Sequence, residues 1–458
     1  MKKLLTLAAL LMLSTSLFAK PKQSYNIYNA RQTPEWFRSG VTYQLMPRTF
    51  SEEGTLKGAE KHLQRLADMG ITVVYLLPVC TADTDMDQSK WSPRQKKSGF
   101  NDPRNPYRIS DYFHVDPEYG TDQDLKDFVN KAHSLGMKVF LDLVFAHCGP
   151  SATVVKQHPE YFKYNDKGEM MLTKWKFPMF DTNYSGTRAY FRTIMAYYLA
   201  NYNVDGFRCD VSDYVPISFW EEARAELELL KPDLVMVAES RSYFNTRYAF
   251  DANYNWRVSN PLRYTLFKSK RVEGKGGIAY VRQCHENQRA LSPKGGLLWN
   301  MTDNHDWSTD AFENRFEKRL GHECGELVIA FSFALDGLPF ILNGQEIGHD
   351  KRVSLFGHEG CWIDWEKDGA TKLAKDRTAK IKAWAQMRKE YKSLTHGVTE
   401  WIDNDLPAEV LSFRRTYEGC PDVLFVGNFS DKAVTVKLAD GSKHKLAPWG
   451  YIFEPQKK

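Results

Sequence analysis

The chain has 458 residues, of which 42% are hydrophobic and 26% charged, and it carries a formal net charge of +5. This length accommodates a barrel of roughly 250 residues with insertions and a small second domain. The weak charge, without any Lys/Arg run, argues against nucleic acid as a partner. After the N-terminus no apolar run is long enough for a membrane span, so we expect none in the mature chain, and the oligomeric state stays open.

Residues 1–19 have the pattern of a secretory signal peptide. Lys2 and Lys3 supply the positive start and residues 4–13 the apolar stretch. The alternative is a membrane anchor, but the apolar stretch is short for a span of roughly 20 residues. We therefore expect cleavage near Ala19 and a secreted or periplasmic protein.

From residue 41 onward, short β-rich runs alternate with helical stretches, which is typical of parallel βα units. Strands are predicted at 41–45, 71–77, 139–144, 204–207, 234–237, 249–253, 296–299 and 338–342. Helices are predicted at 56–69, after a Thr121 cap, at 188–200, at 217–230 and at 372–389. The fold class is therefore α/β, a (β/α)₈ TIM barrel.

Two segments depart from this rhythm. Residues 148–185 follow the third strand with no long period, and we interpret them as an insertion. The pattern changes again over 393–458, where short alternating runs separated by turn signals predict an antiparallel β-sandwich. The barrel itself would then comprise residues 20–147 and 186–392.

Charged and polar residues stand where the predicted strands end. They are Asp142 and His147 after strand three, Arg208 and Asp210 on strand four, Glu239 after strand five, and Asp303, Asn304, His305 and Asp306 after strand seven. In a barrel of this kind the active site forms at the C-terminal ends of the strands. These side chains are therefore expected to share one face.

The spacing of two of these acids suits glycoside hydrolysis. A retaining glycosidase needs a carboxylate nucleophile and a carboxylic acid about 5–5.5 Å apart. Asp210 and Glu239 lie one βα unit apart, so adjacent strands can present them across a cleft. Arg208 lies on the same face of its strand and can hold Asp210 ionised, whereas a less polar pocket would keep Glu239 protonated. Each motif alone is more often structural, such as a strand ending in an ion pair.

Four segments resemble, in order, the signature regions of the α-amylase superfamily (glycoside hydrolase family 13): LDLVFAH (141–147), GFRCD (206–210), AES (238–240) and TDNHD (302–306). The resemblance implies that 148–185 is the family's B domain. It also implies residue roles: Asp210 as nucleophile, Glu239 as acid/base, Asp306 as transition-state stabiliser, His147 and His305 as sugar contacts, Arg208 as orienter of the nucleophile, Tyr107 as a stacking ring, and Asp142 as a brace for the arginine.

The sequence departs from the family pattern at positions that affect calcium binding and substrate specificity. Many members bind calcium through an asparagine where this chain has Ala146, which has no side-chain oxygen for a hard cation. We therefore predict no calcium at that position and no other cofactor. Asp213 and Tyr214 replace a common Lys-His pair after the nucleophile. The basic loop is made of Arg94, Lys96, Lys97 and Arg104, and it is either part of an unusual subsite or a solvated surface.

The expected function is hydrolysis of α-1,4 or α-1,6 glucosidic bonds in malto-oligosaccharides or starch fragments, through a covalent glycosyl-enzyme. Transglycosylation or isomerisation of the same sugars is an alternative, because it uses the same intermediate. A catalytically silent sugar-binding protein on this fold is a second alternative. Endo or exo action, the linkage and the pairing of the seven cysteines stay open.

Overall fold

The computed structural model of the protein describes residues 27–310 and 314–456, so the expected signal peptide lies outside the described residues. Eight parallel strands close into a barrel in the order β1, β2, β5, β6, β7, β8, β9 and β10. Their bounds are Thr42–Leu45, Val73–Leu76, Lys138–Leu143, Gly206–Cys209, Val235–Ala238, Ala252–Tyr254, Leu297–Met301 and Leu338–Leu342. Each predicted strand overlaps one of these, and the barrel is confirmed.

The barrel forms because its strands are apolar without interruption. Strands β2 (VVYL) and β7 (VMVA) are buried at every position, as expected for parallel strands covered on both faces. Large rings fill the interior: the Trp299 ring centroid lies 5.6 Å from Tyr75 and 5.2 Å from Phe340. The barrel is therefore a packed core, and its chemistry must lie at the rim.

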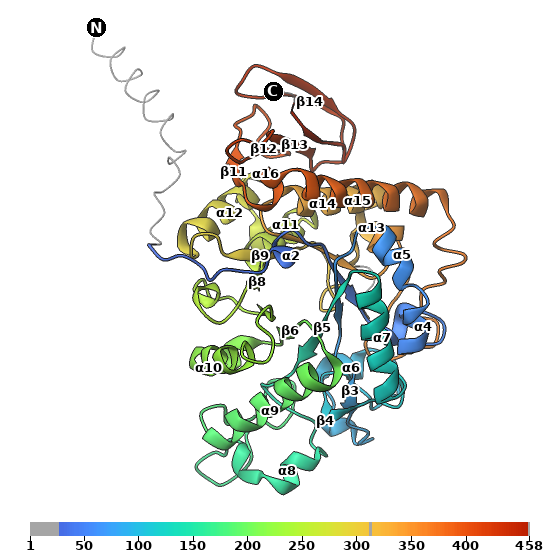
Figure 1. Cartoon of the computed structure of the whole chain (residues 1–458). Helices are drawn as coiled ribbons and strands as arrows, with labels where there is room; N and C mark the ends of the chain where they lie inside the picture. The colour runs from blue at the N-terminus through green and yellow to red at the C-terminus, as the bar shows by residue number, and fades with distance from the viewer. Residues whose placement is uncertain (1–26, 311–313, 457–458) are drawn as a thin grey trace, which may run out of the picture.

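Helices surround the barrel, as Figure 1 shows. The main ones are α7 (Asp122–Ser134), α9 (Ser185–Tyr202), α10 (Ile217–Leu227), α11 (Trp256–Leu266), α12 (Ala279–Leu291), α14 (His322–Ala334) and α15 (Lys372–Glu390). The Thr121 cap is confirmed, since Thr121 and Asp124 form a reciprocal capping box. The helix predicted at 56–69 is divided in two: the segment forms α4 (Leu56–Glu60) and α5 (Leu63–Asp68), with a turn at Lys61 and His62 between them.

Two segments that interrupt the barrel, residues 79–120 and the insertion at 148–185, lie on the opposite side of the barrel from residues 393–458 (Figure 1). In residues 79–120, β3 (Cys80–Ala82) and β4 (Ile109–Val115) pair antiparallel, and neither strand is among those that the sequence predicts. The insertion after β5 contains α8 (Thr153–Gln157) and short bridges such as Phe162–Phe180. Its bridge between His147 and Met179 brings the insertion to the end of β5.

The C-terminal region is antiparallel, as predicted. Four strands lie in the order β11 (Val398–Trp401), β12 (Val410–Thr416), β13 (Val423–Asn428) and β16 (Tyr451–Pro455), and β14 (Val434–Lys437) pairs with β15 (Lys443–Leu446). Val410, Val426 and Val436 help to form a small core between the two sheets. On the other face of the larger sheet, Phe331 of α14 packs against Phe425. This contact ties the β-sandwich to the barrel.

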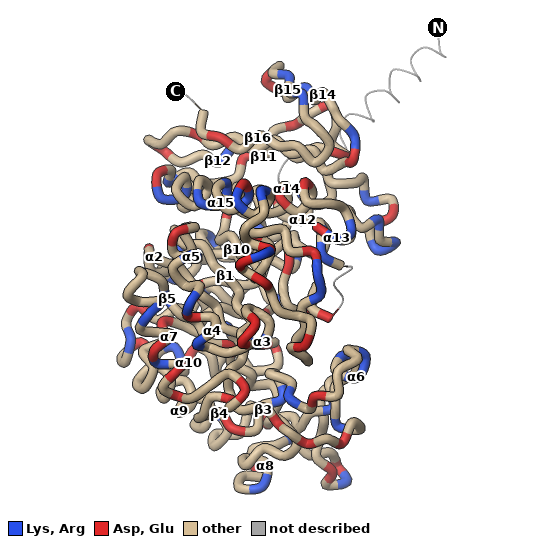
Figure 2. Tube along the Cα trace, turned by 90° about the vertical axis from the view of Figure 1, so that its right-hand side faces the viewer, with Lys and Arg blue, Asp and Glu red and all other residues tan. Residues whose placement is uncertain are grey.

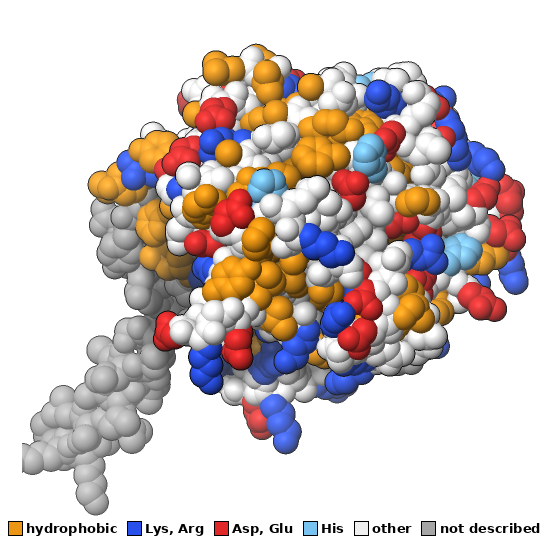
Figure 3. Space-filling model, turned by 90° about the horizontal axis from the view of Figure 1, so that it is seen from below, with side chains coloured by type: hydrophobic (Ala, Val, Ile, Leu, Met, Phe, Trp, Pro, Cys, Tyr) orange, Lys and Arg blue, Asp and Glu red, His pale blue; other side chains and the backbone are white. Residues whose placement is uncertain are grey.

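The surface carries both signs of charge. Lysine and arginine are intermixed with aspartate and glutamate over the whole trace (Figure 2), and hydrophobic side chains lie between them on the face in Figure 3. Within residues 27–310 and 314–456, no helix is long and apolar enough to cross a membrane.

Candidate active site

The predicted site residues meet at the C-terminal rim of the barrel. Asp210 directly follows β6, and Glu239 directly follows the neighbouring strand β7. Asp142 lies within β5, and His147 comes four residues after that strand ends. Because all eight strands run parallel, their C-terminal ends face the same side. The strand geometry thus brings together side chains that are far apart in the sequence.

Arg208 lies at the centre of the site. Its Nη1 donates to Oδ1 of Asp142 and to Oδ1 of Asp210, both over 2.7 Å, and its Nη2 donates to Oε2 of Glu239 over 2.7 Å. The Arg208 side chain is fully buried. Burial opposes its charge, but the surrounding acids raise the pKa of Arg208 well above its usual value. Since one guanidinium binds both Asp210 and Glu239, these two carboxyls lie beside each other.

The carboxyls of Asp210 and Glu239 hold protons more tightly than free carboxyls. Burial raises the pKa of Asp210 well above its usual value, and Arg208 opposes that shift. Burial also raises the pKa of Glu239, to about 7, again against Arg208, and the negative charge of Asp306 adds to the rise. Arg208 faces three acids with a single positive charge. The pair Asp210 and Glu239 can therefore keep one proton at neutral pH while sharing one cation.

A chain of hydrogen bonds fixes Tyr107 and His305. Gln44 of β1 donates from Nε2 to Nδ1 of His305 over 2.7 Å, so the ring proton of His305 lies on Nε2. That Nε2 lies 2.8 Å from the Tyr107 hydroxyl, which donates to Oδ2 of Asp142 over 2.8 Å. The two rings stack with centroids 5.3 Å apart. Burial lowers the pKa of His305 to about 3, so the ring is neutral.

His147 keeps one nitrogen available. Its Nε2 donates to the backbone oxygen of Tyr107 over 3.1 Å, which leaves Nδ1 as an acceptor. Nδ1 is buried and has no hydrogen-bond partner among residues 27–310 and 314–456. Burial lowers the pKa of His147 to about 4. The rings of Trp175 and Phe177 from the insertion lie 5.2 and 5.0 Å away. A neutral, unpaired acceptor in this position can receive a hydrogen bond from a hydroxyl group.

Asp306 lies at the edge of the group, and its side chain is 41% exposed. Arg94 donates from Nη1 to its Oδ1 over 3.1 Å. Although burial opposes ionisation, the positive charges of Arg94 and Arg208 contribute to a lowered pKa of Asp306. Of the basic loop, Lys96 and Lys97 are exposed and Arg104 pairs with Asp102, so Arg94 is the member that reaches the site.

Two residues of the site do not stand out in the sequence. Arg94 is one of several basic residues in a loop, and Gln44 lies inside a predicted strand. No local pattern identifies either one, because their partners lie 212 and 261 residues away. Asp213, noted as a departure from the family, accepts from the backbone N–H of Arg241 over 2.9 Å and so links the ends of β6 and β7.

The residues at the family's calcium position do not suit a metal. Ala146 is buried and supplies no side-chain oxygen. Within the part of the chain that the structure describes, no group of three or more His, Cys, Asp or Glu could hold a metal ion.

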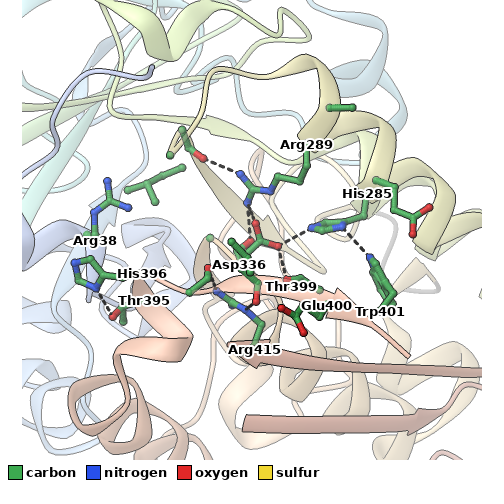
Figure 4. A pocket seen from close by; sticks show the side chains of 18 of the residues that line it. Arg38, His285, Arg289, Asp336, Thr395, His396, Thr399, Glu400, Trp401 and Arg415 are labelled. Carbon is green, nitrogen blue, oxygen red and sulfur yellow. Dashed lines mark hydrogen bonds and ion pairs between the residues drawn. The ribbon is translucent and has the colours of Figure 1, made fainter. Parts of the chain in front are cut away.

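A cavity of about 720 Å³ lies elsewhere, between α12 and β11, and includes none of the predicted site residues. Figure 4 shows that several of its polar groups bind one another around Asp336. Asp336 accepts from His285 over 2.6 Å and from Thr399 over 2.8 Å, and it also pairs with Arg289. We therefore place the chemistry at the rim around Arg208 and not in this cavity.

Known proteins resemble the chain over most of its length. The family model for the alpha amylase catalytic domain matches residues 29–169 and 162–403. A cyclomaltodextrinase of Geobacillus thermopakistaniensis is 24% identical, over 90% of this chain and 73% of its own length. An intracellular maltogenic amylase of Bacillus subtilis is 25% identical, over 84% and 68%.

Solved structures share the fold. A maltogenic alpha-amylase from Thermotoga neapolitana superposes with a TM-score of 0.75 at 24% identity, covering 92% of this chain and 98% of its own. An alpha-amylase from Lactobacillus plantarum gives a TM-score of 0.75 at 22% identity, covering 92% of this chain and all of its own.

Proposed function

The chain belongs to the alpha-amylase family, and from that premise we propose that it cleaves α-1,4 or α-1,6 glucosidic bonds with retention of configuration. It is a glycoside hydrolase whose substrates are α-glucans or malto-oligosaccharides. The proposal concerns the linkage, the covalent mechanism and the role of each residue. It rests above all on one observation: Asp210 and Glu239, on adjacent strand ends, accept hydrogen bonds from the same buried guanidinium.

The two acids divide the chemistry between them. In the first step the Asp210 carboxylate attacks the anomeric carbon, while Glu239 gives its proton to the departing glycosidic oxygen. In the second step Glu239 takes a proton from water, whose oxygen attacks the same carbon and releases Asp210. Arg208 favours the charged form of Asp210, and the pKa of about 7 lets Glu239 act first as an acid and then as a base.

The remaining residues hold the sugar. Nδ1 of His147 is free to accept from a ring hydroxyl, and the exposed part of the Asp306 carboxylate can do the same. Tyr107 is fixed by Asp142 and His305, and the ring face that does not stack on His305 can stack on a sugar ring. Asp142 acts through Arg208 and Tyr107 as a support.

The test is product analysis with the protein from residue 20 onward. It is incubated with maltoheptaose, pullulan and isomaltose, and the products are separated by chromatography while NMR follows the anomer that forms first. We expect shorter saccharides released as the α-anomer. Release of the β-anomer would contradict retention, and products longer than the substrate would indicate transglycosylation. Asp210→Asn serves as the control and should be inactive on all three.

We further propose that residues 1–19 are a signal peptide that is removed on export. We also propose the domain boundaries, with the B domain at residues 148–185 and the β-sandwich at residues 393–458. Support for export comes from the sequence alone, through Lys2, Lys3 and the apolar stretch after them. Mass spectrometry of the protein made in its own cells should give a mature N-terminus close to residue 20. An intact Met1 in the soluble cell fraction would contradict export.

A further inference from the structure

The carboxyls around the site are held by two different arginines. Arg208, from inside the barrel, binds Asp142, Asp210 and Glu239. It makes no hydrogen bond to Asp306. Among the hydrogen bonds of the described residues, the side-chain donor to the Asp306 carboxylate is Arg94, whose Nη1 lies 3.1 Å from Oδ1. The His305 ring is neutral and its Nε2 lies 3.7 Å from the same oxygen. Arg94 is therefore the cation that faces Asp306 directly.

Arg94 is itself anchored by hydrogen bonds and by an aromatic ring. Its Nη2 donates to the backbone oxygens of His305 and of Thr309, the latter over 3.2 Å, so both ends of the turn that carries Asp306 are bound. Its guanidinium lies 5.7 Å from the Phe356 ring centroid. Its side chain is only 33% exposed. These contacts fix the guanidinium against the turn that carries Asp306.

The segment that carries Arg94 is also held in place. It forms the short helix α6 (Pro93–Lys97), which Ser92 caps by accepting from the backbone N–H of Gln95 over 3.1 Å. The Gln95 side chain is buried and donates to the backbone oxygens of Asp102 and Pro103, both over 3.0 Å. At the end of the helix, Arg352 donates to the backbone oxygen of Ser98. The helix that carries Arg94 is thus fixed by hydrogen bonds that do not involve Asp306.

We propose that Arg94 is a positioning residue for Asp306. Its ion pair keeps the carboxylate ionised and aimed at the sugar, and so it contributes to the rate through Asp306. This proposal rests on the role of Asp306 in the proposed function. The competing explanation is that Arg94 only docks α6 onto the turn at 305–309, in which case Asp306 would not matter to its effect.

Kinetics of a double-mutant cycle separate these explanations. Arg94→Gln should lower kcat/KM on maltoheptaose by about 10- to 100-fold, mostly in kcat, because a hydrogen bond to a charged group is lost. In an Asp306→Asn background the same change should cost less than about 2-fold. Arg94→Lys keeps the charge and should lose less than Arg94→Gln. Lys97→Gln, from the same helix but exposed, is the matched control and should behave as wild type. Equal losses from Arg94→Gln in both backgrounds would overturn the proposal.

A second measurement does not depend on turnover. Asp-selective ¹³C labelling, with Asp306 assigned from its missing signal in Asp306→Asn, gives the pKa of this carboxyl by NMR. The charged or titratable groups that face it are Arg94, His305, Arg208, Glu239 and Tyr107. Arg94→Gln should raise the pKa of Asp306, and Lys97→Gln should leave it unchanged. An unchanged pKa in Arg94→Gln would overturn the proposal even if the wild type degrades α-glucans, whereas a wild type without turnover would count against the proposed function alone.

Discussion

Arg208 donates a hydrogen bond to Glu239 over 2.7 Å, from Nη2 to Oε2. The backbone N–H of Val211 donates to the same oxygen over 2.9 Å. Both donors bind one carboxyl oxygen, and neither binds Oε1, which can therefore carry the proton that the acid step needs. The arginine that binds the proposed nucleophile thus also orients the proposed acid/base. This shared contact couples the carboxyls of Asp210 and Glu239.

Replacing Glu239 by glutamine should separate acid catalysis from the rest of the reaction. Glu239→Gln removes the proton donor, so turnover of maltoheptaose should fall by about 10²- to 10⁴-fold. An α-glucoside with an activated phenolate leaving group needs no proton for the first step and should be affected much less. The comparison of kcat on the two substrates measures this. Equal losses on both would contradict the assignment of Glu239 as the acid.

The rate should depend on pH through the same group. Glu239 must be protonated to act, and its pKa is raised to about 7. The reactive form is therefore present below that pH and is lost as the pH rises through it, so kcat/KM should fall above about 7. Asp306→Asn removes a negative charge that raises this pKa, so its alkaline limb should move to lower pH. Complete pH–rate profiles of both proteins provide the check. A limb at the same pH in both would show that Asp306 does not act on Glu239.

Loss of Arg208 should destabilise the fold as well as abolish activity. Arg208→Met leaves three neighbouring buried acids without their cation, which should lower the free energy of unfolding by about 3–5 kcal/mol. Arg104→Met is the matched control: Arg104 is 40% exposed and pairs with Asp102, so its loss should cost about 0–1 kcal/mol. Urea denaturation gives both values. Similar losses for the two variants would argue against a central role for Arg208.

His147 should contribute to binding. Its free Nδ1 can accept one hydroxyl hydrogen bond, so His147→Ala should weaken binding of maltotriose by about 3- to 10-fold. Titration calorimetry in an Asp210→Asn background measures this without turnover. The control is His158→Ala: His158 lies in the insertion that follows His147, its side chain is 46% exposed, and the variant should bind as before. If both variants bind like the parent, His147 does not contact the sugar.

Removal of divalent metal should leave the fold intact. Ala146 offers no side-chain oxygen at the position where many family members hold calcium. The melting temperature should therefore be the same with and without EDTA. A fall in melting temperature that added Ca²⁺ reverses would prove this expectation wrong.

The sequence by itself determined the barrel and the positions of Asp210 and Glu239. Apolar runs such as 73–76 and 235–238 can be recognised from neighbouring residues alone. A residue directly after a parallel strand must lie at the C-terminal rim of the barrel, because the direction of the chain places it there.

Only the tertiary structure decided which side chains meet at that rim. The Arg94–Asp306 pair and the Gln44–His305 bond join residues 212 and 261 positions apart. The pairing of β3 with β4 likewise depends on where the intervening chain returns. The pKa of Glu239 is raised by burial and by the charge of Asp306, which stand together only after the barrel has closed. The physical reason is that a sequence pattern reflects neighbouring residues only. The contacts and the burial of a side chain depend on residues that are far apart in the sequence and meet only in the folded chain.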